Sequence, residues 1–141
     1  MSDNLATVSK IYEAFGKGDI PTVLTYLADD VQWEDWTDNS AQQAGVPWFQ
    51  SQTGREGAFE FFKIIGQWKF HDFQILSLMV GSDKVAAEVK VDIEIPMTGA
   101  HLRDEEVHLW TFNEAGQVSR FRHYSDTAKH IDAAGITTLI D

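Results

Sequence analysis

The stretch Val85-Ala86-Ala87-Glu88-Val89-Lys90-Val91-Asp92-Ile93-Glu94-Ile95 places an apolar side chain at every second position. Successive side chains of a β-strand point to opposite faces of the sheet, so this alternation predicts a strand with one buried and one exposed face. Turn residues bound it on both sides, with Gly81-Ser82-Asp83 before it and Thr98-Gly99 after it. The stretch therefore predicts one strand in a hairpin-linked run.

The same period of two continues on either side of this stretch. It predicts strands at 70–79, 105–112 and 118–125, with a turn between the last two. A short helix from Asp126 or Thr127 to about Ala133 is expected after the last strand. The C-terminal half is therefore expected to be mostly sheet.

The N-terminal half shows helical spacing instead. Apolar residues recur at helical spacing from Leu5 to Phe15, a second helix is expected after Asp19, and a third covers 58–67. A strand is expected to begin within 29–36, after the second helix. Helices followed by a run of antiparallel strands are typical of an α+β fold, and 141 residues fit one domain spanning 1–141.

Composition narrows the possible partners. The chain carries 22 acidic and 11 basic residues, for a net charge of -11. This charge repels phosphate backbones and anionic lipid surfaces, so we expect neither nucleic-acid nor membrane binding. Aromatic residues are numerous, with 9 Phe, 5 Trp and 3 Tyr. So many rings must fill a core, line a pocket or form an interface.

The sequence lacks the motifs of several enzyme classes. It contains no cysteine, which excludes disulfides and thiol chemistry. It contains no glycine-rich phosphate loop and no G-x-S-x-G motif, and we expect no cofactor. No apolar run is long enough to span a bilayer, and the first residues do not resemble a signal peptide, so a cytoplasmic protein is expected.

Asp35 is the first candidate for a catalytic role. Strand alternation would put Trp33 and Asp35 on one face and Glu34 and Trp36 on the other. A carboxylate that points into an apolar pocket has a raised pKa, which suits a general base. The alternative is that Asp35 begins a turn and stays solvated, as most carboxylates do.

Two histidines on adjacent strands are the next candidates. His108 shares a strand face with Trp110, and His123 shares one with Phe121. If both face one space, they can exchange protons near neutral pH. With a carboxylate they could form a two-His-one-carboxylate metal site, but no compact ligand motif is present and we expect no metal. The remaining histidines are expected in loops or at the surface: His71, His101 and His130.

The segment from Thr37 to Thr53 is long and polar, with an apolar tip at 46–49. A loop of this length in a compact domain is more often functional or mobile than neutral. Two interpretations stay open, a flap over a pocket or a surface loop whose tip packs on a neighbouring subunit.

Four stretches spread over nearly the whole chain carry a family resemblance. They are Val8-x-x-Ile11-Tyr12-x-Ala14-Phe15-x-x-Gly18-Asp19, Tyr26-Leu27-Ala28-Asp29-Asp30-Val31-x-Trp33, Gly54-Arg55-Glu56-Gly57-x-x-x-Phe61-Phe62, and Leu109-Trp110-Thr111-Phe112-x-x-x-Gly116-Gln117-Val118 followed by Tyr124-x-Asp126. They resemble the SnoaL-like polyketide cyclase family, which belongs with the ketosteroid isomerases to the nuclear transport factor 2-like superfamily. The resemblance is specific for the fold and weak for the reaction, because this fold hosts many chemistries.

The resemblance implies a cone-shaped α+β barrel. A strongly curved antiparallel sheet would wrap around three helices from the N-terminal half, with a short C-terminal helix. It also implies a deep, mostly apolar pocket and a homodimer formed through the outer face of the sheet.

The resemblance also implies roles for single residues. Asp35 falls on the catalytic base of the isomerases, and His108 falls on their protonated acid. Phe121 and His123 fall on strand positions that line the pocket. The isomerase tyrosine has no counterpart, since Tyr12 stands one residue, about 100° of helix rotation, from its position. An Asp with two His also resembles the scytalone dehydratase-type members.

We therefore expect acid/base catalysis, of isomerase, cyclase or dehydratase type, on a small apolar carbonyl compound in a metal-free pocket. Asp35 would be the base, and His108 and His123 would polarise the oxygen or return the proton. The side chains expected to bind the substrate are Tyr12, Trp33, Phe61, Trp110 and Phe121. The alternative is a non-catalytic ligand-binding protein or dimeric scaffold of the same fold.

Overall fold

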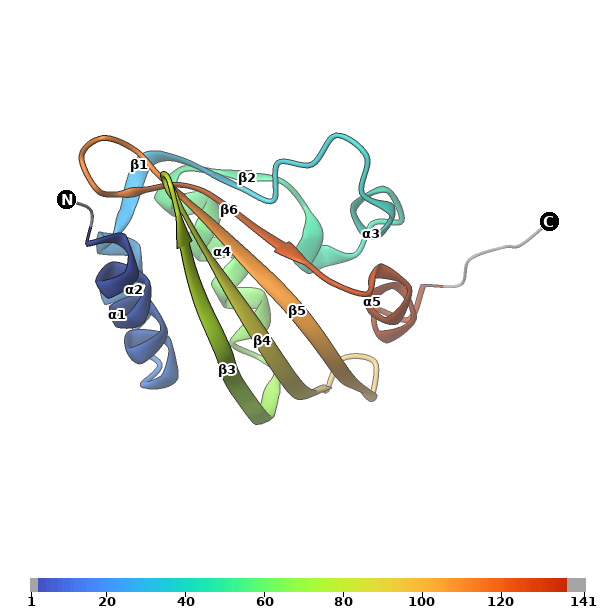
Figure 1. Ribbon diagram of the computed structural model, residues 1–141. Helices are drawn as coiled ribbons and strands as arrows, with labels where there is room; N and C mark the ends of the chain where they lie inside the picture. Colours follow the sequence, from blue (N-terminus) through green and yellow to red (C-terminus); the bar gives the residue numbers. More distant parts are fainter. Residues whose placement is uncertain (1–2, 137–141) are drawn as a thin grey trace.

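The structure is a computed structural model and describes residues 3–136 (Figure 1). Its helices are α1 (Asn4–Gly16), α2 (Ile20–Thr25), α3 (Ser40–Gln43), the 3-10 turn η1 (Pro47–Phe49), α4 (Gly54–Ile65) and α5 (Thr127–Ala133). Its strands are β1 (Leu27–Trp33), β2 (Gln52–Thr53), β3 (Lys69–Gly81), β4 (Lys84–Ile95), β5 (Ala100–Phe112) and β6 (Val118–Tyr124). The predicted α+β order of helices followed by hairpin-linked strands is confirmed.

The six strands form one curved sheet in the order β2-β1-β6-β5-β4-β3. All neighbours pair antiparallel except β1 and β6, which run parallel. Figure 1 shows α4 behind the long strands β3 to β5, α1 and α2 at one end of the sheet, and α3 and α5 at the other. The predicted curved sheet around helices is confirmed, but it does not close into a barrel, because β2 and β3 remain edges.

The alternating stretch forms most of β4, between β3 and β5 in the sheet. Its inward apolar side chains, from Val85 to Ile95, are at most 3% exposed. Residues on the opposite face, such as Glu88 and Lys90, are exposed. The inward face packs against rings that include Tyr12 and so forms one wall of the core. Alternation along the chain therefore decides which side of the sheet faces the helices.

The segment 37–53 is a folded part of the core. It contains α3, η1 and β2, and Val46 and Phe49 at its tip are fully buried. The Asn39 side chain caps α3 by accepting from the Gln42 backbone N–H at 2.9 Å. The Gln42 amide in turn donates to the backbone oxygens of Glu34 and Phe49, both at 2.9 Å. These bonds close the segment on itself, so its tip packs into the protein's own core and is not free for a neighbouring subunit.

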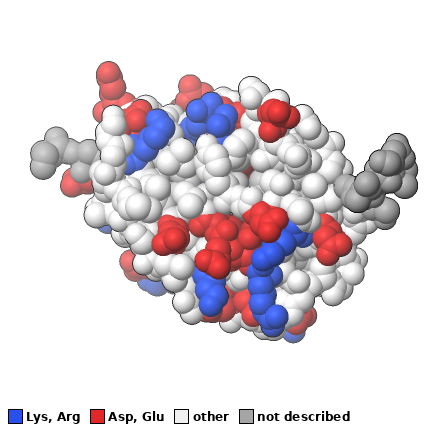
Figure 2. Space-filling model, turned by 45° about the vertical axis from the view of Figure 1, so that its right-hand side comes forward, with Lys and Arg blue, Asp and Glu red and all other residues white. Residues whose placement is uncertain are grey.

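The surface carries charges of both signs. Figure 2 shows one side of the molecule, on which an uncharged band separates two groups of mixed acidic and basic side chains. No large basic area appears on this side, in keeping with the net charge of -11. Within residues 3–136, no helix is long and apolar enough to cross a membrane.

Candidate functional site

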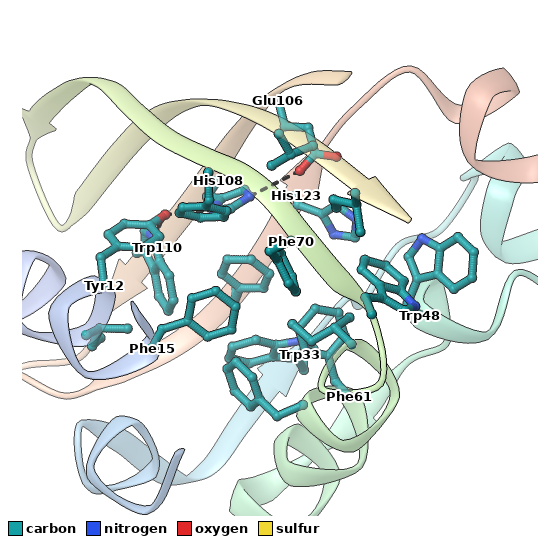
Figure 3. Close-up of a pocket in the computed structure, with 18 of the residues that line it drawn as sticks. Tyr12, Phe15, Trp33, Trp48, Phe61, Phe70, Glu106, His108, Trp110 and His123 are labelled. Carbon is teal, nitrogen blue, oxygen red and sulfur yellow. Dashed lines mark hydrogen bonds and ion pairs between the residues drawn. The ribbon is translucent and has the colours of Figure 1, made fainter. Parts of the chain in front are cut away.

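A pocket lies between the inner side of the sheet and the helices α1 and α4 (Figure 3). The space inside it that the centres of water molecules can occupy is about 70 Å³. Aromatic rings form most of its wall. Five of these rings belong to the residues that the sequence indicated for substrate binding: Tyr12, Trp33, Phe61, Trp110 and Phe121.

These aromatic side chains pack against one another. Trp33 stacks on Phe121 with ring centroids 4.3 Å apart, and Trp110 lies 4.5 Å from Phe121. The ring of Phe61 lies 5.4 Å from that of Trp33. The structure thus brings the five residues together from α1, β1, α4, β5 and β6. Their contact with a substrate stays a prediction.

Asp35 is not among the residues that line the pocket. β1 ends at Trp33, and Glu34 has a positive φ of 57°, which interrupts the strand alternation that the sequence analysis extended to Asp35. The Asp35 carboxylate accepts hydrogen bonds from Arg120 at 2.9 Å and from Arg122 at 3.1 Å. Partial burial acts to raise the pKa of Asp35, but the two arginines outweigh it and lower the pKa. This environment does not suit a general base.

Glu34 is the carboxylate that turns inward. It is fully buried, and Nδ1 of His123 donates a hydrogen bond to it. It also accepts from the backbone N–H of His123 at 3.3 Å and from Nε1 of Trp36 at 2.8 Å. Sequence reasoning missed Glu34 because a left-handed backbone at a glutamate has no residue-type signal, unlike one at glycine or asparagine.

His123 presents one free ring nitrogen to the pocket. It lines the cavity, and Glu34 occupies its Nδ1. Its Nε2 has no hydrogen-bond partner among the described residues and is not a fully enclosed atom. Phe49 stacks on the ring with centroids 4.1 Å apart and fixes its orientation. Because Glu34 holds Nδ1 of His123, Nε2 is the ring nitrogen that can accept a proton from a ligand.

His108 has both ring nitrogens engaged. Nδ1 lies 2.7 Å from the Tyr12 hydroxyl, and Nε2 lies 3.2 Å from Glu106. The Tyr12 oxygen also accepts from Nε1 of Trp110 at 3.1 Å. Burial raises the pKa of the Tyr12 hydroxyl, so it keeps its proton. A ligand can therefore contact the Tyr12 hydroxyl, which is hydrogen-bonded to His108.

His130 contradicts the expectation of a surface position. It is 2% exposed, since α5 turns it toward the pocket on the same helix face as the buried Ala133. Nε1 of Trp48 donates to its Nδ1 at 2.8 Å. Its Nε2 lies 2.9 Å from Asp104 and 3.0 Å from Glu106. The spacing of three between His130 and Ala133 was the one sequence signal that could have indicated this burial. The expected exposure of His71 and His101 is confirmed.

Two influences on His130 oppose each other. Burial acts to lower the pKa of His130, and the hydrogen bonds to Asp104 and Glu106, taken without the Trp48 donor, would raise it to about 9. A charged ring, however, carries a proton on Nδ1, where it would meet the N–H of Trp48 at 2.8 Å. An indole nitrogen can only donate. We therefore assign His130 as neutral, with its proton on Nε2.

The assignment of the His130 proton to Nε2 argues against a metal site. Glu106, His123 and His130 each offer a ligand atom, and these atoms lie within 4.8 Å of one another. Two histidines and a carboxylate can hold a divalent ion. A ligating His130 would need an unprotonated Nε2 and hence a proton on Nδ1, against the Trp48 donor. The arrangement around Trp48 therefore fits a hydrogen-bond network better than a metal site.

Two pairs of histidine and carboxylate thus face one apolar cavity. His123 is paired with Glu34 and His108 with Glu106, and the two imidazole centroids are 6.3 Å apart. His123, His108 and Tyr12 all line this cavity, so a small molecule bound there faces all three side chains. The arrangement can remove a proton at one point of a bound molecule and stabilise or reprotonate an oxygen at another.

Comparison with known proteins gives a family match and a set of structural neighbours. The sequence model for the SnoaL-like domain matches residues 8–121 of the chain. No curated protein sequence matches it.

Solved structures share the fold at low sequence identity. A nuclear transport factor 2-like protein of unknown function from Burkholderia pseudomallei is 24% identical, with 98% of this chain and 100% of that chain covered and a TM-score of 0.76. One from Burkholderia thailandensis is 19% identical, with 94% and 98% covered and a TM-score of 0.78. A Mycobacterium tuberculosis protein in complex with estradiol-17beta-hemisuccinate is 21% identical, with 88% and 94% covered and a TM-score of 0.70.

Proposed function

The chain belongs to the SnoaL-like domain family, and from this membership and the geometry of the pocket we propose that it catalyses a proton transfer in a small, largely apolar carbonyl compound. The reaction is of isomerase, cyclase or dehydratase type. The observation that carries the proposal is the pair of Glu34 and His123, in which a buried carboxylate holds one ring nitrogen and leaves the other facing an apolar cavity.

The roles of the site residues follow from their contacts. His123 takes the proton at Nε2, and Glu34 stabilises the imidazolium that forms. As negative charge develops on the carbonyl oxygen, the Tyr12 hydroxyl turns its proton from Nδ1 of His108 to that oxygen. The base is thus assigned to His123 instead of Asp35, since two arginines hold the Asp35 carboxylate.

The size of the cavity constrains the ligand. Pockets for small molecules usually measure about 300–1,000 Å³, well above the space found here. A ligand must therefore be small, or several lining rings must rotate to admit it. A relative of the same fold is in complex with a steroid ester, which supports an apolar ring compound as ligand.

A non-catalytic ligand-binding protein is the second candidate. Two observations favour it: the cavity is small, and most polar groups around it are already hydrogen-bonded to one another. Such a protein would hold its ligand without needing a free base. The unpaired Nε2 of His123 is the feature that it does not explain.

Two further parts of the proposal concern assembly and location. We propose a homodimer through the outer face of the sheet, where Val107 and Tyr124 are neighbours in register and are 36% and 42% exposed. Apolar side chains on a sheet face are suited to a second copy of the same face. A cytoplasmic location and the lack of nucleic-acid binding remain predictions from the sequence.

Proton exchange tests the proposal without knowledge of the product. Small cyclic ketones are incubated with the protein in D2O, and loss of the α-proton signal is followed by NMR. The exchange should slow by about 100-fold or more in His123→Gln, the usual worth of a positioned base. Asp35→Asn tests the sequence-based assignment and should retain exchange.

The outcome separates the two candidates. Binding of estradiol-17beta-hemisuccinate, detected by tryptophan fluorescence, with no exchange of any ketone would favour the ligand-binding protein. Loss of exchange in Asp35→Asn, with exchange retained in His123→Gln, would return the base to Asp35.

A further inference from the structure

A chain of hydrogen bonds runs along the pocket wall from Trp48 to Tyr12, and Figure 3 marks its bond between His108 and Glu106. Trp48 contacts His130 at 2.8 Å, His130 contacts Glu106 at 3.0 Å, Glu106 contacts His108 at 3.2 Å, and His108 contacts Tyr12 at 2.7 Å. These hydrogen bonds link η1, α5, β5 and α1. The proposed reaction uses only the last two members of this hydrogen-bond chain, His108 and Tyr12.

The Trp48 end fixes the direction of the first two bonds. Because the indole N–H can only donate, Nδ1 of His130 accepts and the single ring proton lies on Nε2. That N–H points at two carboxylates, Asp104 at 2.9 Å and Glu106 at 3.0 Å. His130 is therefore a fixed neutral donor within the wall.

Glu106 receives a bond on each oxygen. Oε2 faces His130 and Oε1 faces His108. The titratable groups around it are His108, His130, His123 and Tyr12, with Asp104 sharing the His130 proton. Burial alone would raise the pKa of Glu106, but the bonds to His108 and His130 outweigh it and hold the pKa well below its usual range. Glu106 is thus a carboxylate, and His108 donates to it from Nε2.

We propose that His130 is a positioning residue that keeps Glu106 ionised. The Glu106 carboxylate then holds the proton of His108 on Nε2, so that Nδ1 of His108 is the nitrogen that exchanges a proton through Tyr12. In the empty site the Tyr12 hydroxyl donates to Nδ1. When a ligand hydroxyl gives its proton to the Tyr12 oxygen, the Tyr12 proton moves to Nδ1 of His108. The ligand is left as an oxyanion, His108 becomes an imidazolium, and Glu106 balances its charge.

This inference rests on the proposed function and names a substrate feature. The site takes a ligand with an enol or phenol hydroxyl placed at Tyr12, in addition to the carbon acid facing His123. It also makes Trp48, in the segment 37–53, part of the electrostatics of the site, because its N–H keeps His130 neutral. Through this chain of hydrogen bonds, Trp48 helps to decide which ring nitrogen of His108 carries the proton.

The first test needs no ligand. The ring nitrogens of the histidines are labelled with 15N, and long-range NMR correlations report which nitrogen carries the proton. At pH 7, His108 and His130 should both be neutral with the proton on Nε2. Trp48→Phe should convert His130 to the charged form, because the donor that opposed the second proton is gone. Trp68→Phe is the matched control, since the Trp68 ring packs 4.9 Å from that of Trp48, while the hydrogen bond to Nδ1 of His130 comes from Trp48. This variant should leave His130 neutral.

The second test is the pH profile of α-proton exchange. His130→Leu removes a donor to Glu106, so the acidic limb of the profile should move to higher pH. His130→Gln keeps a neutral amide donor, and the profile should return to that of the unsubstituted protein. A merely structural role would lower the rate in His130→Leu without moving the limb.

Three results would overturn the inference. They are a charged or Nδ1-protonated His130 in the unsubstituted protein at pH 7, an acidic limb that does not move in a folded His130→Leu variant, and stoichiometric Zn²⁺ binding that His130→Leu abolishes. If the tautomers are as expected but no ketone exchanges its protons, the proposed function is refuted. The inferred hydrogen bonds of Glu106 to His130 and His108 would still hold.

Discussion

The positive φ of Glu34 places the neighbouring carboxylates of Glu34 and Asp35 in different environments, one in the core and one beside two arginines. Glu34, at φ 57°, turns its carboxylate into the core against His123. Asp35, the next residue, faces Arg120 and Arg122. A left-handed glutamate costs of order 1–3 kcal/mol and persists only where surrounding contacts hold it, as often occurs at functional sites. The buried bond to His123 is the contact that holds it here.

At this scale we expect Asp35→Asn to act on stability and not on binding. Loss of the two ion pairs should lower the free energy of unfolding by about 1 kcal/mol, the upper range for exposed pairs, because Asp35 keeps 23% of its side chain exposed. Since the pKa of Asp35 is lowered, its contribution is present above the unfolded value near 3.8 and is lost as pH falls through the folded value. Urea unfolding at pH 7 and pH 3 measures both effects. Asp30→Asn, at an exposed position, is the control and should change neither.

Trp48→Phe should change how the stability of the protein depends on pH. If that change lets His130 take a second proton, the folded pKa of about 9 exceeds the unfolded value of 6.5. A raised pKa contributes stability that is complete below 6.5 and is lost as pH rises through about 9. The variant should therefore lose stability between these pH values relative to the unsubstituted protein. Equal pH dependence of urea unfolding for the two proteins would contradict the assignment of His130 as neutral.

At the scale of elements, α4 approaches β2 too closely for a larger side chain. A Cβ on Gly57 would lie 2.9 Å from Cβ of Gln52 and 3.2 Å from its backbone carbon. Gly57→Ala would gain about 1 kcal/mol of helix propensity on an isolated helix, but forcing α4 away from β2 costs about 1–3 kcal/mol. We expect net destabilisation in thermal unfolding. Gly16→Ala in α1 is the matched control, because its Cβ would meet nothing within 4 Å, and this variant should be neutral or stabilised.

Phe49 anchors the segment that carries η1 in the core. Phe49 is fully buried and stacks on His123. Phe49→Ala should therefore cost about 3–5 kcal/mol, as for other large core truncations. Phe59→Ala, 42% exposed on α4, is the control and should cost much less. A cost below about 1 kcal/mol for Phe49→Ala would favour the interpretation of this segment as a loosely held flap.

For the whole molecule, the outer sheet face predicts self-association. On this face, Val107 of β5 pairs with Tyr124 of β6, and Met79 of β3 pairs with Ala86 of β4. Val107→Glu places a like charge on both copies of a symmetric interface, so it should convert a dimer to a monomer in light scattering. Met97→Glu, 84% exposed at the turn after β4, is the control. A monomer before substitution would remove the dimer from the proposed function.

Local sequence patterns predict the long helices, the strands β3 to β6 and the faces of those strands. Alternation in β4 and β5 fixed which side chains point inward, and the predicted set of Tyr12, Trp33 and His108 does reach one pocket. These features depend on neighbours along the chain, because strand and helix periodicity is local. The tertiary structure alone decided that Glu34 and not Asp35 turns inward, that the segment 37–53 joins the core, and that His130 is buried. Each of these depends on partners far away in the chain, such as Trp48 and His130, 82 residues apart, which no local pattern encodes.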